Sequence, residues 1–266
     1  MTRIAEAFRT AAAEKRAAFI AYLTAGDPSS AATVALAQAL DRAGADVLEL
    51  GVPFSDPIAD GPVLQRAAER ALAAGTDLDA VFGMAREIKR RTSLALVLFS
   101  YMNPLLRRGV ARTASDARAA GFDGVLVTDL PPEEAGDVRP AFRQADLDTV
   151  FLVSPTSGAA RMDRAARLSS GFLYVMSRPG TTGARLELPA GLAGTVRRAR
   201  KAAGRLPVAI GFGIATPEAA SKAAALSDGV VVGSALVRAA EQAGEGREEA
   251  VERLARQLAL ACRKEA

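Results

Sequence analysis

The carboxylate of Glu49 stands inside a run of apolar residues, 47–51, where charged side chains are uncommon. A carboxylate that is buried there has a raised pKa and can act as a general acid or base near neutral pH. A second carboxylate, Asp60, follows in the stretch after the same run. Two carboxylates in different surroundings can divide an acid role and a base role between them. The open alternatives are a structural glutamate that pairs with an arginine and an aspartate that forms a turn.

Two further aspartates are weaker candidates for chemistry. Asp56 and Asp129 also follow apolar runs, but Asp56 precedes Pro57, where a turn is the simpler explanation. Other mechanisms are limited by missing residue types, because the chain has no histidine and one cysteine, Cys262. These counts exclude a histidine base, a histidine-containing metal site and a thiolate zinc site, so we expect no metal.

Glycine-rich turns close two later apolar runs, at residues 210–214 and 232–235. Glycine lets the backbone approach a phosphate closely, and the start of a following helix offers N–H donors and a positive dipole. Glycine at both turns, with Ser234 at an expected helix start, predicts a phosphate site. Ordinary tight turns between a strand and a helix are the alternative.

The elements that position these residues alternate regularly along the chain. Longer amphipathic stretches separate short, continuously apolar runs, which is the pattern of strands that are buried on both faces. Ser29-Ser30 and Thr216-Pro217 are helix start signals, and a third helix is expected to have Ser115 near its start and to end at Gly121. The expected strands are 19–24, 47–51, 94–100, 124–129, 149–154, 172–177, 207–211 and 229–233.

Eight strands that alternate with helices predict an α/β fold, a single (β/α)8 TIM barrel spanning residues 1–266. We expect an extra N-terminal helix, 4–13, that caps the barrel floor, and a short added helix at 63–72. The connections after strands 2 and 6 are extended; the second of these, 178–187, has glycines that could act as hinges of a lid. Active sites of such barrels lie at the C-terminal ends of the strands, where both carboxylates and both glycine turns fall.

Charge and hydropathy exclude several classes of protein. The chain has 34 Lys and Arg against 30 Asp and Glu, and the two signs are mixed along it. Without a concentrated basic and aromatic stripe, we expect no nucleic-acid binding. No run of 18 apolar residues and no apolar signal segment is present, so we expect no membrane association. A single cysteine cannot form an intrachain disulfide and agrees with a reducing cytoplasm.

Residues 48–62, LELGVPFSDPIADGP, resemble the signature of the tryptophan synthase α subunit family. A match of this length and order is highly specific. The resemblance extends over essentially the whole chain, through further motifs at 25–28, 101–104, 129–134, 177–183, 211–213 and 233–234.

The resemblance implies a retro-aldol reaction that cleaves indole-3-glycerol phosphate into indole and glyceraldehyde 3-phosphate. Glu49 matches the family's general acid/base, which protonates indole C3 and then takes the proton of the glycerol hydroxyl. Asp60 matches the carboxylate that holds the indole N–H, and Thr182 matches the lid residue that orients it. The implied phosphate contacts are Gly183, Gly213, Gly233 and Ser234, and the implied indole pocket is lined by Tyr22, Tyr174 and Phe212.

Three positions depart from the family pattern, all of them in the expected lid: Pro179, Thr181 and Arg185. These departures could change the stiffness of the lid, but they leave Glu49 and Asp60 in place.

The resemblance also implies a partner. It is a β subunit that carries pyridoxal phosphate and receives indole in an α2β2 assembly, whereas this chain itself needs no cofactor. Three alternatives stay open from the sequence: another phosphosugar barrel such as an isomerase, a regulatory partner of β with weak activity of its own, and a free-standing producer of indole.

Overall fold

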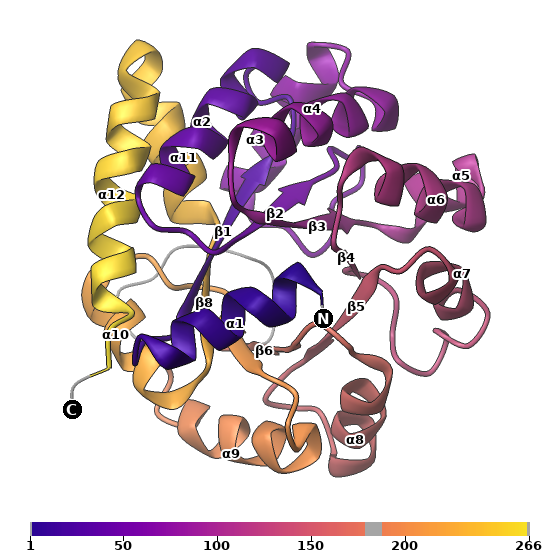
Figure 1. Ribbon diagram of the computed structural model, residues 1–266, viewed down its shortest axis with the longest axis vertical. Helices are drawn as coiled ribbons and strands as arrows, with labels where there is room; N and C mark the ends of the chain where they lie inside the picture. Colours follow the sequence, from indigo (N-terminus) through magenta and orange to yellow (C-terminus); the bar gives the residue numbers. More distant parts are fainter. Residues whose placement is uncertain (1, 179–187, 265–266) are drawn as a thin grey trace.

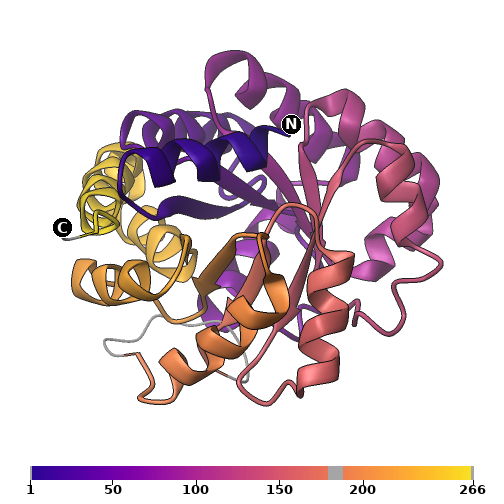
Figure 2. The ribbon, with the colours of Figure 1, turned by 60° about the horizontal axis from the view of Figure 1, so that its bottom comes forward.

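The computed structural model describes residues 2–178 and 188–264, and its strands form a closed parallel barrel in the order β1 to β8 (Figure 1). Figures 1 and 2 show the helices as an outer layer around these strands. The predicted TIM barrel is therefore confirmed. The strands are β1 (Ala18–Thr24), β2 (Val47–Gly51), β3 (Ala95–Ser100), β4 (Gly124–Val127), β5 (Asp148–Val153), β6 (Leu173–Met176), β7 (Val208–Gly211) and β8 (Gly229–Val232).

The helices follow the strands in regular alternation, with extra helices at four places. An N-terminal helix precedes β1, and two helices follow each of β2, β3 and β8. None of the helices in the described residues has the length and apolar character needed to cross a membrane. The helices are α1 (Arg3–Ala13), α2 (Ser30–Arg42), α3 (Pro62–Ala73), α4 (Leu78–Arg91), α5 (Met102–Arg108), α6 (Val110–Ala120), α7 (Arg139–Gln144), α8 (Ala159–Leu168), α9 (Leu192–Ala203), α10 (Pro217–Leu226), α11 (Ser234–Ala243) and α12 (Arg247–Ala261).

Local sequence signals predicted the starts of two helices correctly and the start of a third incorrectly. The side chains of Ser29 and Thr216 accept N–H hydrogen bonds at the starts of α2 and α10, as predicted. Ser115, expected near a helix start, lies in the middle of α6 instead. Gly109, with φ of +91°, separates α5 from α6, so the helix begins five residues earlier. The prediction from Ser115 did not take into account that Gly109 separates two helices.

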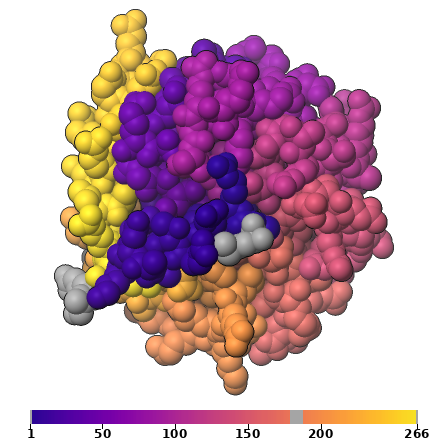
Figure 3. All heavy atoms as spheres, in the orientation of Figure 1, coloured from indigo at the N-terminus to yellow at the C-terminus, as the bar shows by residue number. Residues whose placement is uncertain are grey.

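The expected floor helix is confirmed as α1, which lies across the N-terminal ends of the strands (Figures 1 and 3). Ile4 and Phe8 of this helix are buried. The Phe8 ring contacts that of Phe172 inside the barrel, with 5.5 Å between centroids. Helix α1 therefore covers this end of the barrel. That the whole chain forms one domain stays a prediction.

Aspartates that directly precede even-numbered strands connect the strands at the floor. Each carboxylate accepts the backbone N–H of a residue at the start of the preceding strand and also pairs with a cationic side chain. For Asp123, the backbone N of Leu96 lies 2.9 Å away and Lys89 Nζ lies 2.6 Å away. The equivalent groups at the other two positions are Asp46 with Phe19 N and Arg16, and Asp228 with Val208 N and Arg200.

Replacing Asp123 should destabilise the barrel more than replacing Asp228. The Asp123 side chain is 6% exposed and that of Asp228 is 33% exposed, so water can replace the lost carboxylate less easily at the first position than at the second. We expect Asp123→Ala to lower the free energy of unfolding by about 3 kcal/mol and Asp228→Ala by about 1 kcal/mol. Urea unfolding followed by circular dichroism measures both values, and equal losses would contradict this account.

Candidate active site

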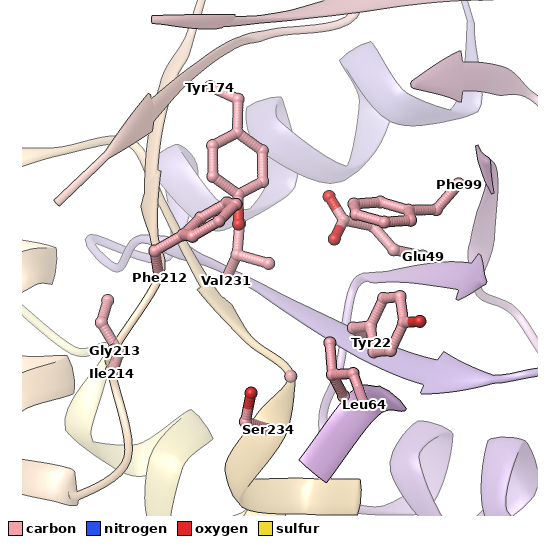
Figure 4. A pocket seen from close by; sticks show the side chains of 11 residues that line it. Tyr22, Glu49, Leu64, Phe99, Tyr174, Phe212, Gly213, Ile214, Val231 and Ser234 are labelled. Carbon is pink, nitrogen blue, oxygen red and sulfur yellow. The ribbon is translucent and has the colours of Figure 1, made fainter. Parts of the chain in front are cut away.

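A cavity opens at the C-terminal ends of the strands and collects most of the residues that the sequence predicted (Figure 4). The empty space among its lining residues, including the part that is open to solvent, is about 420 Å³. Thr182 and Gly183 lie outside the described residues, as do Pro179, Thr181 and Arg185. The lining residues are Tyr22, Glu49, Leu64, Phe99, Tyr174, Phe212, Gly213, Ile214, Val231, Gly233 and Ser234.

Glu49 is the acidic residue of the cavity wall. It lies in the middle of β2, opposite Tyr22 of β1 and Val97 of β3 in the strand register. It is 1% exposed, and its Oε1 has no hydrogen-bond partner in the part of the chain that the structure describes. Burial raises the pKa of Glu49 to about 8. Among residues 2–178 and 188–264 no arginine or lysine forms an ion pair with it, so the alternative of a structural pair finds no support there.

Asp60 lies on the connection between β2 and α3 and is also buried. Its Oδ2 accepts a hydrogen bond from the Tyr101 hydroxyl at 3.0 Å, while its Oδ1 has no partner. Burial raises the pKa of Asp60 to about 6, although the bond from Tyr101 opposes the shift. The backbone N–H of Asp60 donates to Pro57 O, so a turn is present. The turn explains the backbone, but it does not account for a buried carboxylate.

The two carboxylates therefore differ in their preferred charge near neutral pH. With a pKa near 8, Glu49 is mostly protonated at pH 7, whereas Asp60, with a pKa near 6, is mostly ionised. A protonated carboxyl group on β2 and an ionised one on the connection that follows β2 have the two charge states that acid–base chemistry divides between a donor and an anion. Asp60 itself is not among the residues that line the cavity.

Aromatic rings form two walls of the cavity. Tyr22 packs edge-on against Phe99 with 5.1 Å between centroids, and Tyr174 packs edge-on against Phe212 at 5.7 Å. In Figure 4 the Glu49 carboxylate lies between these two pairs. Such walls suit a flat apolar ligand.

Glycines beside the tyrosines make room for this arrangement. A Cβ added at Gly211 would lie 2.0 Å from the Tyr174 hydroxyl, and one at Gly51 would lie 2.2 Å from the Tyr22 hydroxyl. Both glycines end their strands, β7 and β2. The two tyrosines can therefore fill the barrel mouth only because these strand ends carry no side chain.

The other end of the cavity is formed by backbone groups. Helix α11 begins at Ser234, as predicted, and its first intrahelical donors, the N–H groups of Leu236 and Val237, both bond to Gly233 O. The N–H groups of Ser234 and Ala235 precede them, so they have no acceptor within the helix. Among the described residues, the cavity lining contains no Lys or Arg, so the groups here that could hold an anion are N–H groups and the helix dipole.

The sequence did not single out several residues in and beside the cavity, and it left Asp56 and Asp129 as weaker candidates. Tyr101, which bonds both Asp60 Oδ2 and the Ala59 N–H, was seen only as part of a motif, although it directly follows the third apolar run. Asp56 and Asp129 are exposed and bond to nearby groups, so neither joins the cavity. The missed apolar lining residues are Leu64, Phe99, Ile214 and Val231.

The model of the protein family described as tryptophan synthase alpha chain matches residues 8–265. The chain belongs to the tryptophan synthase alpha chain family. It is 52% identical to a tryptophan synthase alpha chain of Solibacter usitatus, covering 92% of this chain and 91% of the relative. A relative with the same name from Geobacter sulfurreducens is 48% identical, with 91% of each chain covered.

Solved structures agree with this assignment. A tryptophan synthase from Mycobacterium tuberculosis superposes with a TM-score of 0.91 at 37% identity, covering 99% of both chains. A tryptophan synthase alpha chain from Legionella pneumophila gives a TM-score of 0.89 at 37% identity, covering 98% of this chain and 97% of the other. Alpha chains of this family catalyse the lyase half-reaction that cleaves indole-3-glycerol phosphate. The resemblance found in the sequence is thereby confirmed, and an isomerase finds no support.

The buried Glu49 should make the stability of the protein depend on pH. Its pKa is raised on folding from 4.5 to about 8, so its contribution is full below about pH 4.5 and is lost as pH rises toward 8. Glutamine does not titrate. The free energy of unfolding of Glu49→Gln should therefore gain on that of the wild type by about 1.4 kcal/mol per pH unit in this window.

Urea unfolding at a series of pH values between 5 and 8.5 measures this difference. Glu248→Gln, at an exposed position of α12, controls for the loss of one negative charge. A pH-independent difference between wild type and Glu49→Gln would show that Glu49 is ionised in the folded protein.

Proposed function

We propose that Glu49 and Asp60 are the catalytic pair that cleaves indole-3-glycerol phosphate into indole and glyceraldehyde 3-phosphate. One observation carries this assignment. Both carboxylates are buried, each has one oxygen without a hydrogen-bond partner among residues 2–178 and 188–264, and their pKa values are separated at about 8 and 6. An unpartnered buried oxygen is costly for folding, so a bound substrate that supplies the missing partner explains why it is kept.

In the proposed mechanism the protonated Glu49 first donates its proton to indole C3. The ionised Asp60 accepts the indole N–H and balances the positive charge that forms on the ring. Glu49, now a carboxylate, then takes the proton of the glycerol hydroxyl. The carbon–carbon bond breaks, its electron pair restores the aromatic indole, and the carbonyl of glyceraldehyde 3-phosphate forms. Protonation has to come first because a carbanion is a prohibitively poor leaving group.

The substrate's two ends match the two parts of the cavity. The indole would lie between the aromatic walls that contain Tyr22, Tyr174 and Phe212, and the phosphate would meet the N–H groups of Gly213, Gly233 and Ser234. The N-terminus of α11, the extra helix after β8, is the position where barrels of this fold commonly bind phosphate. Contacts from Thr182 and Gly183 stay a prediction.

The proposed partner is a tryptophan synthase β subunit in an α2β2 assembly, with pyridoxal phosphate bound only by β. Membership of the family implies a β partner. Ile58, which is 75% exposed on the connection that carries Asp60, offers such a partner an apolar contact beside the cavity mouth. The acid–base mechanism above uses only side chains of this chain, so we propose no cofactor for it. Residence in the cytoplasm, from the single cysteine, stays a prediction.

Conservative changes at the two carboxylates test the catalytic assignment. Glu49→Gln should reduce indole release by roughly 10²- to 10⁴-fold, because it removes the group that handles both protons. Asp60→Asn should lower kcat by roughly 10²-fold or more with KM within a few-fold, because the amide still accepts the N–H but carries no charge. A steep rise in KM at unchanged kcat for Asp60→Asn would make Asp60 a substrate anchor instead.

Indole release measured with and without purified β subunit tests the proposed partner. We expect β to stimulate the activity and Ile58→Glu to reduce that stimulation while leaving basal release unchanged. Indole release that β does not alter would indicate a free-standing indole producer. Release that is negligible without β would indicate a chain that acts mainly as its partner.

A further inference from the structure

Ser177 connects the ends of two neighbouring strands without lining the cavity. It directly follows β6 and is 1% exposed. Its backbone N–H donates to Gly211 O at 2.9 Å, and its hydroxyl donates to the carbonyl oxygen of Phe212. One residue at the end of β6 therefore holds two successive carbonyl groups at the end of β7.

The second of these carbonyls belongs to a residue in an unfavourable conformation. Phe212 has φ of +69°, a left-handed conformation that bulky side chains rarely adopt and that surrounding contacts have to stabilise. The other two non-glycine residues with positive φ in the described part of the chain, Lys15 and Asp146, follow the ends of α1 and α7, where this conformation is common. Phe212 instead follows a strand at the active site.

Peptide geometry connects the Ser177 hydroxyl to the proposed phosphate contact. In a trans peptide the C=O and N–H groups point in opposite directions. The carbonyl of Phe212 points toward Ser177, which directly follows β6. The N–H of the same peptide belongs to Gly213 and therefore points away from β6. Strand β7 lies between β6 and β8 in the barrel, and Gly233 and Ser234 follow β8. The Gly213 N–H is therefore directed to the side on which the other phosphate donors lie.

We propose that Ser177 is a positioning residue for substrate phosphate. Its hydroxyl holds Phe212 in the left-handed conformation, which aims the Gly213 N–H at the phosphate. This inference rests on the proposed function, because it takes Gly213 as a phosphate donor.

Replacing Ser177 by alanine should weaken the binding of phosphate-bearing ligands selectively. With Ser177→Ala we expect the Kd of glycerol 3-phosphate, measured by calorimetry, to rise roughly tenfold, because one phosphate donor is misdirected. The Kd of indole should change less than twofold. In the cleavage assay KM should rise by a similar factor while kcat stays within a few-fold. Ser177→Cys, which keeps the size but donates weakly, should be intermediate.

Ser227→Ala is the matched control. Ser227 is also fully buried and its hydroxyl also bonds backbone carbonyls, of Ala223 and Gly229, but it precedes β8 at the opposite end of the barrel. Ser227→Ala should lower the free energy of unfolding by an amount comparable to that for Ser177→Ala and leave the Kd of glycerol 3-phosphate unchanged. If Ser177→Ala affects that Kd no more than Ser227→Ala does, the positioning role is overturned.

Ser234→Asp separates this failure from a failure of the proposed phosphate site. The added carboxylate would repel phosphate at the start of α11, so this variant should bind glycerol 3-phosphate much more weakly. A strong effect of Ser234→Asp with none for Ser177→Ala overturns the role of Ser177 and keeps the site. No effect of either change would overturn the site and, with it, the role of Ser177.

Discussion

Desolvation of the Glu49 carboxylate is the physical constraint on which the proposed function of this barrel depends. In water a glutamate is ionised at neutral pH and cannot donate a proton. Here the filled interior of a closed barrel surrounds Glu49, and no described cation compensates its charge, so the proton is retained up to a pKa of about 8. A neighbouring arginine would stabilise the fold more easily, but it would also ionise the acid. Burial of Glu49 without a cationic partner costs folding free energy, and the proposed proton donation requires this burial.

Buried carboxylates occur at both ends of the barrel. At the floor, which α1 covers, Asp46 and Asp123 accept backbone N–H groups and pair with cations, and they stabilise strand pairing. Asp148, at the start of β5, differs from them because its buried Oδ2 has no partner among the described residues. Glu49 and Asp60 each also have one oxygen without a partner among the described residues, and in the proposed function these two oxygens are available to a ligand.

Close approach of backbone and side chains determines the shape of the mouth. Tyrosine rings from β1 and β6 occupy the space left by glycines at the ends of β2 and β7. The turn after β7 then takes a left-handed path through Phe212 and Gly213, beside the start of α11. An aromatic surface and a set of N–H donors therefore lie within one cavity, which suits a ligand with a flat ring at one end and an anion at the other.

The sequence by itself determined the fold class, the strands within a few residues, the floor helix and the candidate carboxylates. Apolar runs of strand length report burial on both faces, and barrel geometry places every strand end at one mouth. Tertiary structure alone decided that Glu49 has no described cationic partner, that Tyr101 bonds Asp60, and that Ser177 holds the Phe212 carbonyl. The two hydrogen bonds, Tyr101 to Asp60 and Ser177 to Phe212, join residues 35 or more positions apart. Their existence depends on strand register and on left-handed backbone geometry, neither of which is encoded in the pattern of a short segment.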